Sequence, residues 1–145
     1  MTVRVMGEAF DPWRALADHV LPVPAAQCGA TAVFVGHMRD VNEGDAVARM
    51  ELEHYPGMTE RHLEAICAAA ASRWALIDTL VVHRVGVLAP ADPIVLVAVW
   101  SAHRAEAFEA CRFIMEDLKS RAPFWKKETL PEGSRWVEMN TPGHT

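Results

Sequence analysis

Residues 94–119 read IVLVAVWSAHRAEAFEACRFIMEDLK and join the two patterns on which the fold depends. The first seven residues form an unbroken apolar run, which predicts a buried strand. From about His103 to Lys119, apolar residues recur at helical spacing. The residues expected to face inward from this helix are Phe108, Cys111, Met115 and Leu118. A buried strand that leads directly into a long amphipathic helix indicates a helix packed on a sheet.

The segments around this unit predict more strands than helices. A second long helix is expected over Thr59–Trp74, and a shorter one begins at Asp11-Pro12, an N-cap followed by a first-turn proline, and stops at Pro22. Further strands are expected at VRVMGEAF (3–10), ATAVFVG (30–36, buried on both faces), AVARMELEHY (46–55, part of a hairpin after the turn at 42–45), LIDTLVVHRVG (76–86) and RWVEM (135–139). Two substantial helices among five or six strands, several joined as hairpins, predict an α+β fold.

Length and composition favour a single globular domain spanning residues 1–145. The chain is 51% hydrophobic and 23% charged, with a net charge of -5, which argues against general nucleic-acid binding. Its apolar runs are far shorter than a membrane span, and we expect neither a signal peptide nor a transit peptide. The three cysteines form no CxxC pair, which favours small core residues in a reducing, cytoplasmic compartment.

Residues 119–128, KSRAPFWKKE, gather four cations in an acidic chain. This cluster fits a solvated helix end, a nucleic-acid patch or an anion-handling site. A helix end accounts for Lys119 and Arg121, because cations are favoured there, but it does not account for Lys126 and Lys127. We expect the aromatic pair 124–125 to be buried and to hold these lysines in place. A partly desolvated lysine has a lowered pKa and can act as an acid, base or nucleophile.

Two further segments place cations where strands leave the core. His103 and Arg104 occupy the first turn of the long helix, against its dipole, so they either converge on an anion such as phosphate or, in the case of Arg104, pair with Glu106 or Glu109. Arg39, in GHMRD (36–40), either binds the same anion with a second guanidinium group or pairs with the adjacent aspartate.

Other chemistries find little support in the sequence. The histidines are scattered without HExxH or metal-ligand spacing, and we expect no metal site. There is no GxSxG, no P-loop and no GxGxxG. Cys111 is expected to pack rather than react. Glu51, Glu53 and His54 are accounted for by alternation along a solvated strand.

Taken together, the motifs resemble the family of molybdopterin synthase large, catalytic subunits. The resemblance runs from about Gly29 to Glu138, leaving residues 1–28 and 139–145 as weakly matched ends. Its marks are GATAVFVGHMRD (29–40), LEHYPGMTE (52–60), HRVG (83–86), SAHR (101–104), FIMEDLKSRAPFWKKE (113–128) and RWVE (135–138). Where relatives commonly have Gly-Asp before the core strand, this chain has Ala91-Asp92-Pro93.

The resemblance implies an α/β hammerhead fold and a sulfurtransferase of molybdenum cofactor biosynthesis. The implied reaction moves two sulfurs from the Gly-Gly thiocarboxylate of a small ubiquitin-like subunit into cyclic pyranopterin monophosphate, forming the molybdopterin dithiolene. The implied assembly is a homodimer with one small subunit at each end, a heterotetramer that needs no metal or organic cofactor of its own.

The resemblance also implies a role for each matching residue. Lys119 corresponds to the principal catalytic lysine and Lys126 to the second, with oxyanion stabilisation and proton transfer as expected roles. The remaining substrate-binding positions are His37, Met38, Arg39, His103, Arg104, Lys127 and Glu128. Two alternatives stay open at this point: a non-catalytic scaffold that docks a ubiquitin-like partner, and a different enzyme acting on a phosphorylated heterocycle.

Overall fold

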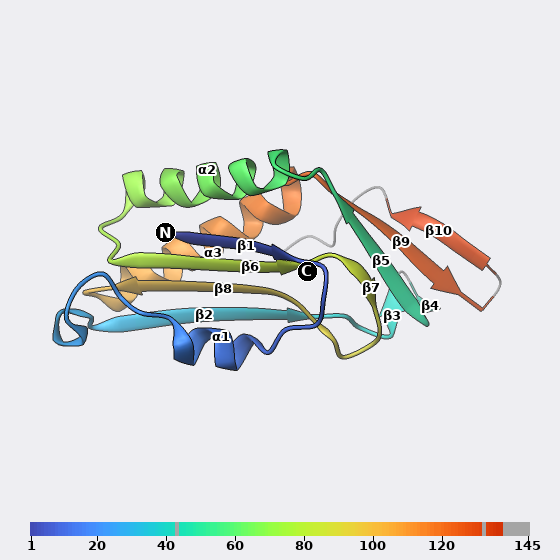
Figure 1. The fold of residues 1–145 in the computed structure, drawn as a ribbon, viewed down its shortest axis with the longest axis horizontal. Helices are drawn as coiled ribbons and strands as arrows, with labels where there is room; N and C mark the ends of the chain where they lie inside the picture. The colour runs from blue at the N-terminus through green and yellow to red at the C-terminus, as the bar shows by residue number, and fades with distance from the viewer. Residues whose placement is uncertain (43, 132, 138–145) are drawn as a thin grey trace.

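The larger of two main sheets forms the centre of the protein in a computed structural model that describes residues 1–42, 44–131 and 133–137 (Figure 1). Its strand order is β1-β6-β8-β2. The strands are β1 (Thr2–Met6), β6 (Asp78–Arg84), β8 (Pro93–Ser101) and β2 (Ala30–His37). β1 runs parallel to β6, and the other pairs are antiparallel. β6 and β8 lie in the middle and are buried on both faces, which agrees with their nearly continuous apolar sequences.

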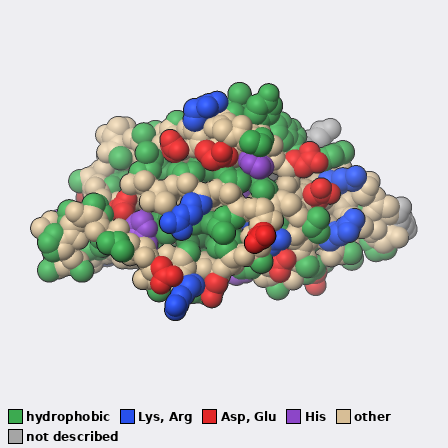
Figure 2. All heavy atoms as spheres, in the orientation of Figure 1, with side chains coloured by type: hydrophobic (Ala, Val, Ile, Leu, Met, Phe, Trp, Pro, Cys, Tyr) green, Lys and Arg blue, Asp and Glu red, His purple; other side chains and the backbone are tan. Residues whose placement is uncertain are grey.

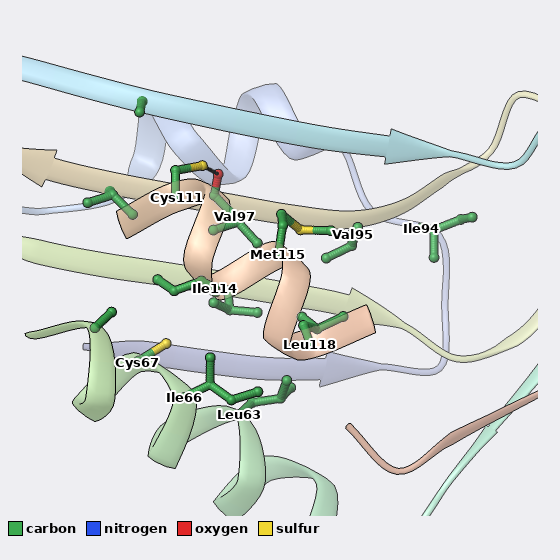
Figure 3. Packing of buried hydrophobic residues seen from close by; sticks show 14 of the residues in the cluster. Leu63, Ile66, Cys67, Ile94, Val95, Val97, Cys111, Ile114, Met115 and Leu118 are labelled. Carbon is green, nitrogen blue, oxygen red and sulfur yellow. Dashed lines mark hydrogen bonds between the residues drawn. The ribbon is translucent and has the colours of Figure 1, made fainter. Parts of the chain in front are cut away.

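Helices cover both faces of this sheet. The helices α2 (Met58–Arg73) and α3 (Arg104–Arg121) lie on one face, and the short α1 (Pro12–Asp18) lies on the other (Figure 1). Because successive strand residues point to opposite faces, alternate residues of β8 enter two separate cores. Val95 and Val97 pack against α3, as Figure 3 shows, in the core that α2 also enters, whereas Leu96 packs on the side of α1. The short helix begins at its predicted N-cap, where Asp11 accepts backbone N–H bonds at 3.0 and 3.3 Å.

A second, smaller sheet extends from one end of the first. Its order is β10-β9-β5-β7, all antiparallel. The strands are β10 (Gly133–Val137), β9 (Phe124–Leu130), β5 (Arg49–His54) and β7 (Gly86–Leu88). A small hairpin of β3 (Val41–Asn42) and β4 (Asp45–Ala46) and a 3-10 turn, η1 (Ala25–Gln27), complete the described elements. The α+β class with mostly antiparallel sheets and two main helices is confirmed.

Several local expectations were wrong. β2 is an edge strand with exposed residues such as Phe34, not a strand buried on both faces. Phe108 points outward from α3 and is 67% exposed. The first strand ends at Met6, four residues early, and Trp125 is 47% exposed rather than buried. Residues 138 and 139 of the expected last strand lie outside the described residues.

Charged side chains of both signs are mixed on the face of the molecule that Figure 2 shows. Within residues 1–42, 44–131 and 133–137, no helix has both the length and the apolar character needed to cross a membrane.

Ala91 holds a backbone conformation that favours glycine. Its φ is 76°, and its N–H donates to the carbonyl oxygen of Met38 at 2.8 Å, while Met38 N–H donates to the carbonyl oxygen of Asp92 at 2.9 Å. This turn therefore fixes the backbone of Met38. A non-glycine residue here costs about 1–2 kcal/mol, and the added freedom of glycine in the unfolded chain offsets part of the gain. We expect Ala91→Gly to raise the free energy of unfolding by about 0.5 to 1 kcal/mol, measured by urea denaturation. An unchanged midpoint would show that the turn is not strained.

Candidate active site

A cavity of about 210 Å³ opens where β2 ends, α3 ends and β9 runs past them. It brings together six of the nine predicted site residues, from segments more than eighty positions apart. Those residues are His37, Met38, Arg39, Lys119, Lys126 and Glu128, and the remaining lining comes from Val41, Asn42, Met50 and Ile94. Three of the predicted cations, Arg39, Lys119 and Lys126, therefore line one cavity.

The two lysines reach this cavity by different routes. Lys119 lies in the last turn of α3, which ends where the Ala122 N–H bonds the carbonyl oxygen of residue 118. Pro123 then leads into β9. Its carbonyl oxygen accepts a hydrogen bond from the hydroxyl group of Thr59 in α2 at 3.2 Å. Because strand residues alternate, β9 turns Lys126 and Glu128 toward the cavity. This bond holds the connection between α3 and β9 against α2.

Burial and mutual repulsion alter both lysines. Burial first, and then the positive charge of Lys126, lower the pKa of Lys119 to about 8. Burial also lowers the pKa of Lys126, with Arg39 acting in the same direction and Glu128 opposing it. Ammonium groups are costly in such a site unless an anion joins them. The cavity is suited to bind an anion and to exchange protons near neutral pH.

Glu128 is held by partners that the sequence did not reveal. Its carboxylate is 4% exposed and accepts hydrogen bonds from Asn42 Nδ2 at 2.9 and 3.1 Å and from Arg135 Nε at 3.0 Å. Arg135 also donates to Asp45 Oδ2 at 2.9 Å and to the Asn42 carbonyl oxygen at 3.0 Å. This network ties β10 and the small hairpin to the cavity wall. In the sequence, Asn42 was interpreted only as part of a turn and Arg135 only as part of a strand.

We expect Arg135→Met to lower the free energy of unfolding by about 2 kcal/mol, because it leaves a buried carboxylate without its charged partner. Urea denaturation measures the change. Arg49→Met on the same sheet is the matched control, since within the described part of the chain the Arg49 side chain makes an exposed hydrogen bond to Thr129 Oγ1 at 3.3 Å and no contact with a buried carboxylate. The control should change stability by less than about 0.5 kcal/mol. Equal losses in the two variants would contradict a special role for the Glu128 pair.

His103 and Arg104 do not reach this cavity within one chain. Both residues lie at the start of α3. Lys119 is fifteen residues further along the same helix, which separates it from Arg104 by about 22 Å along the helix axis. His103 is the N-cap residue, and its N–H lies 3.5 Å from the Ser101 hydroxyl oxygen. Among the residues that the structure describes, Arg104 forms no ion pair with Glu106 or Glu109, the two partners considered for it, and the Glu109 carboxylate accepts a hydrogen bond from the indole N–H of Trp74 at 2.9 Å. One chain therefore separates the two halves of the expected anion site.

Lys127 also lies away from the cavity. It occupies the opposite face of β9 and its Nζ is 5.8 Å from the centre of the Trp136 ring. With Arg49 and Glu51 it borders a separate surface hollow. Arg121 pairs with Asp117 one turn back, as expected for a cation at a helix end. Within the described residues, no group of three His, Cys, Asp or Glu side chains is arranged to hold a metal ion.

Comparison with known proteins gives one consistent result. The family model described as MoaE protein matches residues 5–121. The "Molybdopterin synthase catalytic subunit" of Ralstonia nicotianae is 57% identical over 137 residues, covering 94% of this chain and 77% of that protein. A solved MoaE protein from Burkholderia ambifaria superposes with a TM-score of 0.80 at 49% identity, covering 99% and 93% of the two chains. A solved molybdopterin synthase from Staphylococcus aureus gives 0.82 at 32% identity, covering 92% and 95%.

Proposed function

This chain belongs to the MoaE protein family, and we propose that it is the catalytic subunit of a molybdopterin synthase, a sulfurtransferase of molybdenum cofactor biosynthesis. The observation that carries the proposal is the pair of half-buried lysines, Lys119 and Lys126, beside Arg39 in one cavity. The proposed reaction transfers two sulfurs from the thiocarboxylated C-terminus of a small ubiquitin-like subunit to cyclic pyranopterin monophosphate. Both reactants are anions, and an anion relieves the cost of burying these cations.

Lys119 is proposed to handle the proton that sulfur transfer requires. With a pKa of about 8, roughly nine in ten of these side chains are ammonium at pH 7 and the rest are neutral amines. The ammonium can stabilise a developing oxyanion or protonate a departing oxygen, and the amine can take the proton back. Lys126 is proposed as the second proton carrier. Arg39, with His37 and Met38 beside it, is proposed to bind the cyclic phosphate.

A second copy of the chain is proposed to supply His103 and Arg104. β2 starts beside the end of β8, next to these two residues, and ends at the cavity, so the edge strand and α3 span similar distances. Antiparallel pairing of two β2 edges around a two-fold axis would set the Arg104 end of one copy against the cavity end of the other. Beside β2 lies an apolar groove of about 350 Å³ that such contact would bury. Its lining residues are Ala32, Val33, Phe34, Phe108, Cys111, Arg112, Met115 and Glu116.

The small subunit and the compartment complete the proposal. An extended Gly-Gly tail would enter the cavity with its thiocarboxylate drawn by the three cations. Glu128, in the cavity lining, is proposed to contact the substrate, and Lys127, on the opposite face of β9, is proposed to contact the small subunit outside the cavity. The three cysteines are unpaired, which supports action in a reducing, cytoplasmic compartment.

The test mixes the purified chain with the thiocarboxylated small subunit and cyclic pyranopterin monophosphate, and measures the dithiolene product. Formation of molybdopterin at a rate that depends on this chain supports the proposal. Tight binding of the small subunit with no turnover would instead favour a scaffold. Binding of other phosphorylated heterocycles, but not of the pterin, would favour a different enzyme.

A further inference from the structure

His83 borders the same small cavity as the two lysines, and the proposed mechanism does not use it. It is the sixth residue of β6 and is 3% exposed. Its imidazole borders a small cavity of about 10 Å³ together with Lys119 and Lys126. The remaining walls are apolar and come from Leu52, Ile94, Leu118 and Phe124. This volume is enough for about one water molecule when several polar groups surround it.

Two contacts fix the orientation of the imidazole. Its ring stacks on Phe124 of β9, with centroids 3.9 Å apart and planes 17° apart. Its Nδ1 lies 2.8 Å from the carbonyl oxygen of Arg84. A carbonyl oxygen only accepts hydrogen bonds, so Nδ1 must carry the proton and donate. In a neutral ring, Nε2 then bears a lone pair and can only accept.

The surroundings keep this ring neutral. Burial lowers the pKa of His83 to about 3, and the charge of Lys119 acts in the same direction. Lys126 and His54 also lower it, while the hydrogen bond to the Arg84 carbonyl raises it. These are the charged and titratable groups that face the ring from α3, β9 and β5. At any pH near neutrality, His83 therefore offers an acceptor and takes no proton.

We propose that His83 is a positioning residue for the catalytic lysine. One water molecule in the small cavity would accept a hydrogen bond from the Lys119 ammonium and donate one to the unprotonated Nε2 of His83. The water would have three polar neighbours, the imidazole and the two ammonium groups, which meets the requirement for an ordered buried water. The catalytic importance of Lys119 rests on the proposed function, but the hydrogen bond itself does not.

An acceptor at this position has a definite electrostatic effect. It favours the charged form of Lys119 and so opposes the burial and the repulsion that lower its pKa. It also adds a directional contact that restricts where the ammonium can sit at the end of a long, rotatable side chain. Removing the acceptor should therefore lower the pKa of Lys119 further and leave the group less well placed.

Two substitutions separate the two nitrogens of the ring. His83→Asn retains a donor near the position of Nδ1 and loses the acceptor, whereas His83→Gln places an acceptor near the position of Nε2. In protein labelled with carbon-13 at the lysine ε-carbons, the Lys119 signal is assigned by its absence in Lys119→Met. We expect His83→Asn to lower the titration midpoint of Lys119 by about half a pH unit to one unit, and His83→Gln to keep it within about 0.3.

A purely structural role for His83 would give a different result, because both variants would then leave the Lys119 midpoint where it is. That outcome in folded protein overturns the proposal. If His83→Asn does not fold, His83→Phe takes its place, since it retains the ring that stacks on Phe124 and lacks the acceptor; the same lowered midpoint is expected. The titration needs no substrate. Failure of every chain, including the natural one, to make molybdopterin would count against the proposed function and not against this hydrogen bond.

Discussion

Lys119→Met is expected to reduce molybdopterin formation by about a thousandfold and, at the same time, to make the protein more stable at pH 7. The loss follows because methionine fills a similar volume but carries no proton and no charge. Lys119 stands in the cavity lining beside Lys126 and Arg39, so its removal takes away the group best placed to stabilise or protonate a developing oxyanion.

The gain in stability follows from the pKa of Lys119. The ordinary value is 10.5 and the folded value is about 8, so between these limits the unfolded chain binds more protons than the folded one. Below about pH 8 the folded protein therefore bears the full cost of burying the ammonium, up to roughly 3 kcal/mol. As the pH rises from 8 toward 10.5, that cost disappears. The methionine variant should be more stable than the natural chain at pH 7, with a smaller difference at pH 10.

Product formation and urea denaturation at the two pH values measure these effects. Arg121→Met is the matched control, because Arg121 ends the same helix but pairs with Asp117 and does not line the cavity. It should retain activity within a few-fold and gain no stability. Full activity in Lys119→Met would remove the residue from the mechanism. Loss of activity together with loss of stability would show that the lysine supports the fold instead.

The sequence predicted the elements better than it predicted their exposure. Apolar period and cap residues are local signals, so the long helices begin and end within two residues of the expected positions, at Met58–Arg73 and Arg104–Arg121. The exposure of a side chain depends on which other elements pack against its strand or helix. β2 has the composition of a central strand yet lies at an edge, and Phe108 keeps helical spacing with the buried residues although nothing described in the chain covers it.

The site was predicted in part for the same reason. Lys119 and Lys126 stood out because a helix end could not account for both, and the structure places them together. The sequence did not predict strand β9, because both aromatic residues 124 and 125 were expected to be buried, whereas Phe124 and Lys126 in fact alternate with Trp125 and Lys127 on the two faces of a strand. His83 and Arg135 were missed because their partners lie on other elements. No spacing along the chain reveals a stack on Phe124 or a bond to Glu128.

Because Arg104 and Lys119 lie far apart in one chain, we expect two variant chains that are nearly inactive alone to complement each other in a mixed dimer. Arg104→Ala alone is expected to lower molybdopterin formation by about a hundredfold, because it removes a guanidinium group that would bind the phosphate. In a mixed dimer of Arg104→Ala and Lys119→Met chains, one cavity would combine an intact Lys119 with the intact Arg104 of the other copy. The second cavity would lack both.

Each mixed dimer has one complete cavity out of two. The purified mixed dimer should therefore recover roughly half of the rate of the natural protein, far above either variant alone. The chains are co-expressed with different tags, the mixed dimer is purified through both, and product formation is measured. As a control, Arg39→Ala mixed with Lys119→Met should recover nothing, because both residues line the cavity of the same chain. If Arg104→Ala and Lys119→Met likewise recovered nothing, the two residues would belong to one chain's site, and the proposed pairing of β2 edges would be wrong.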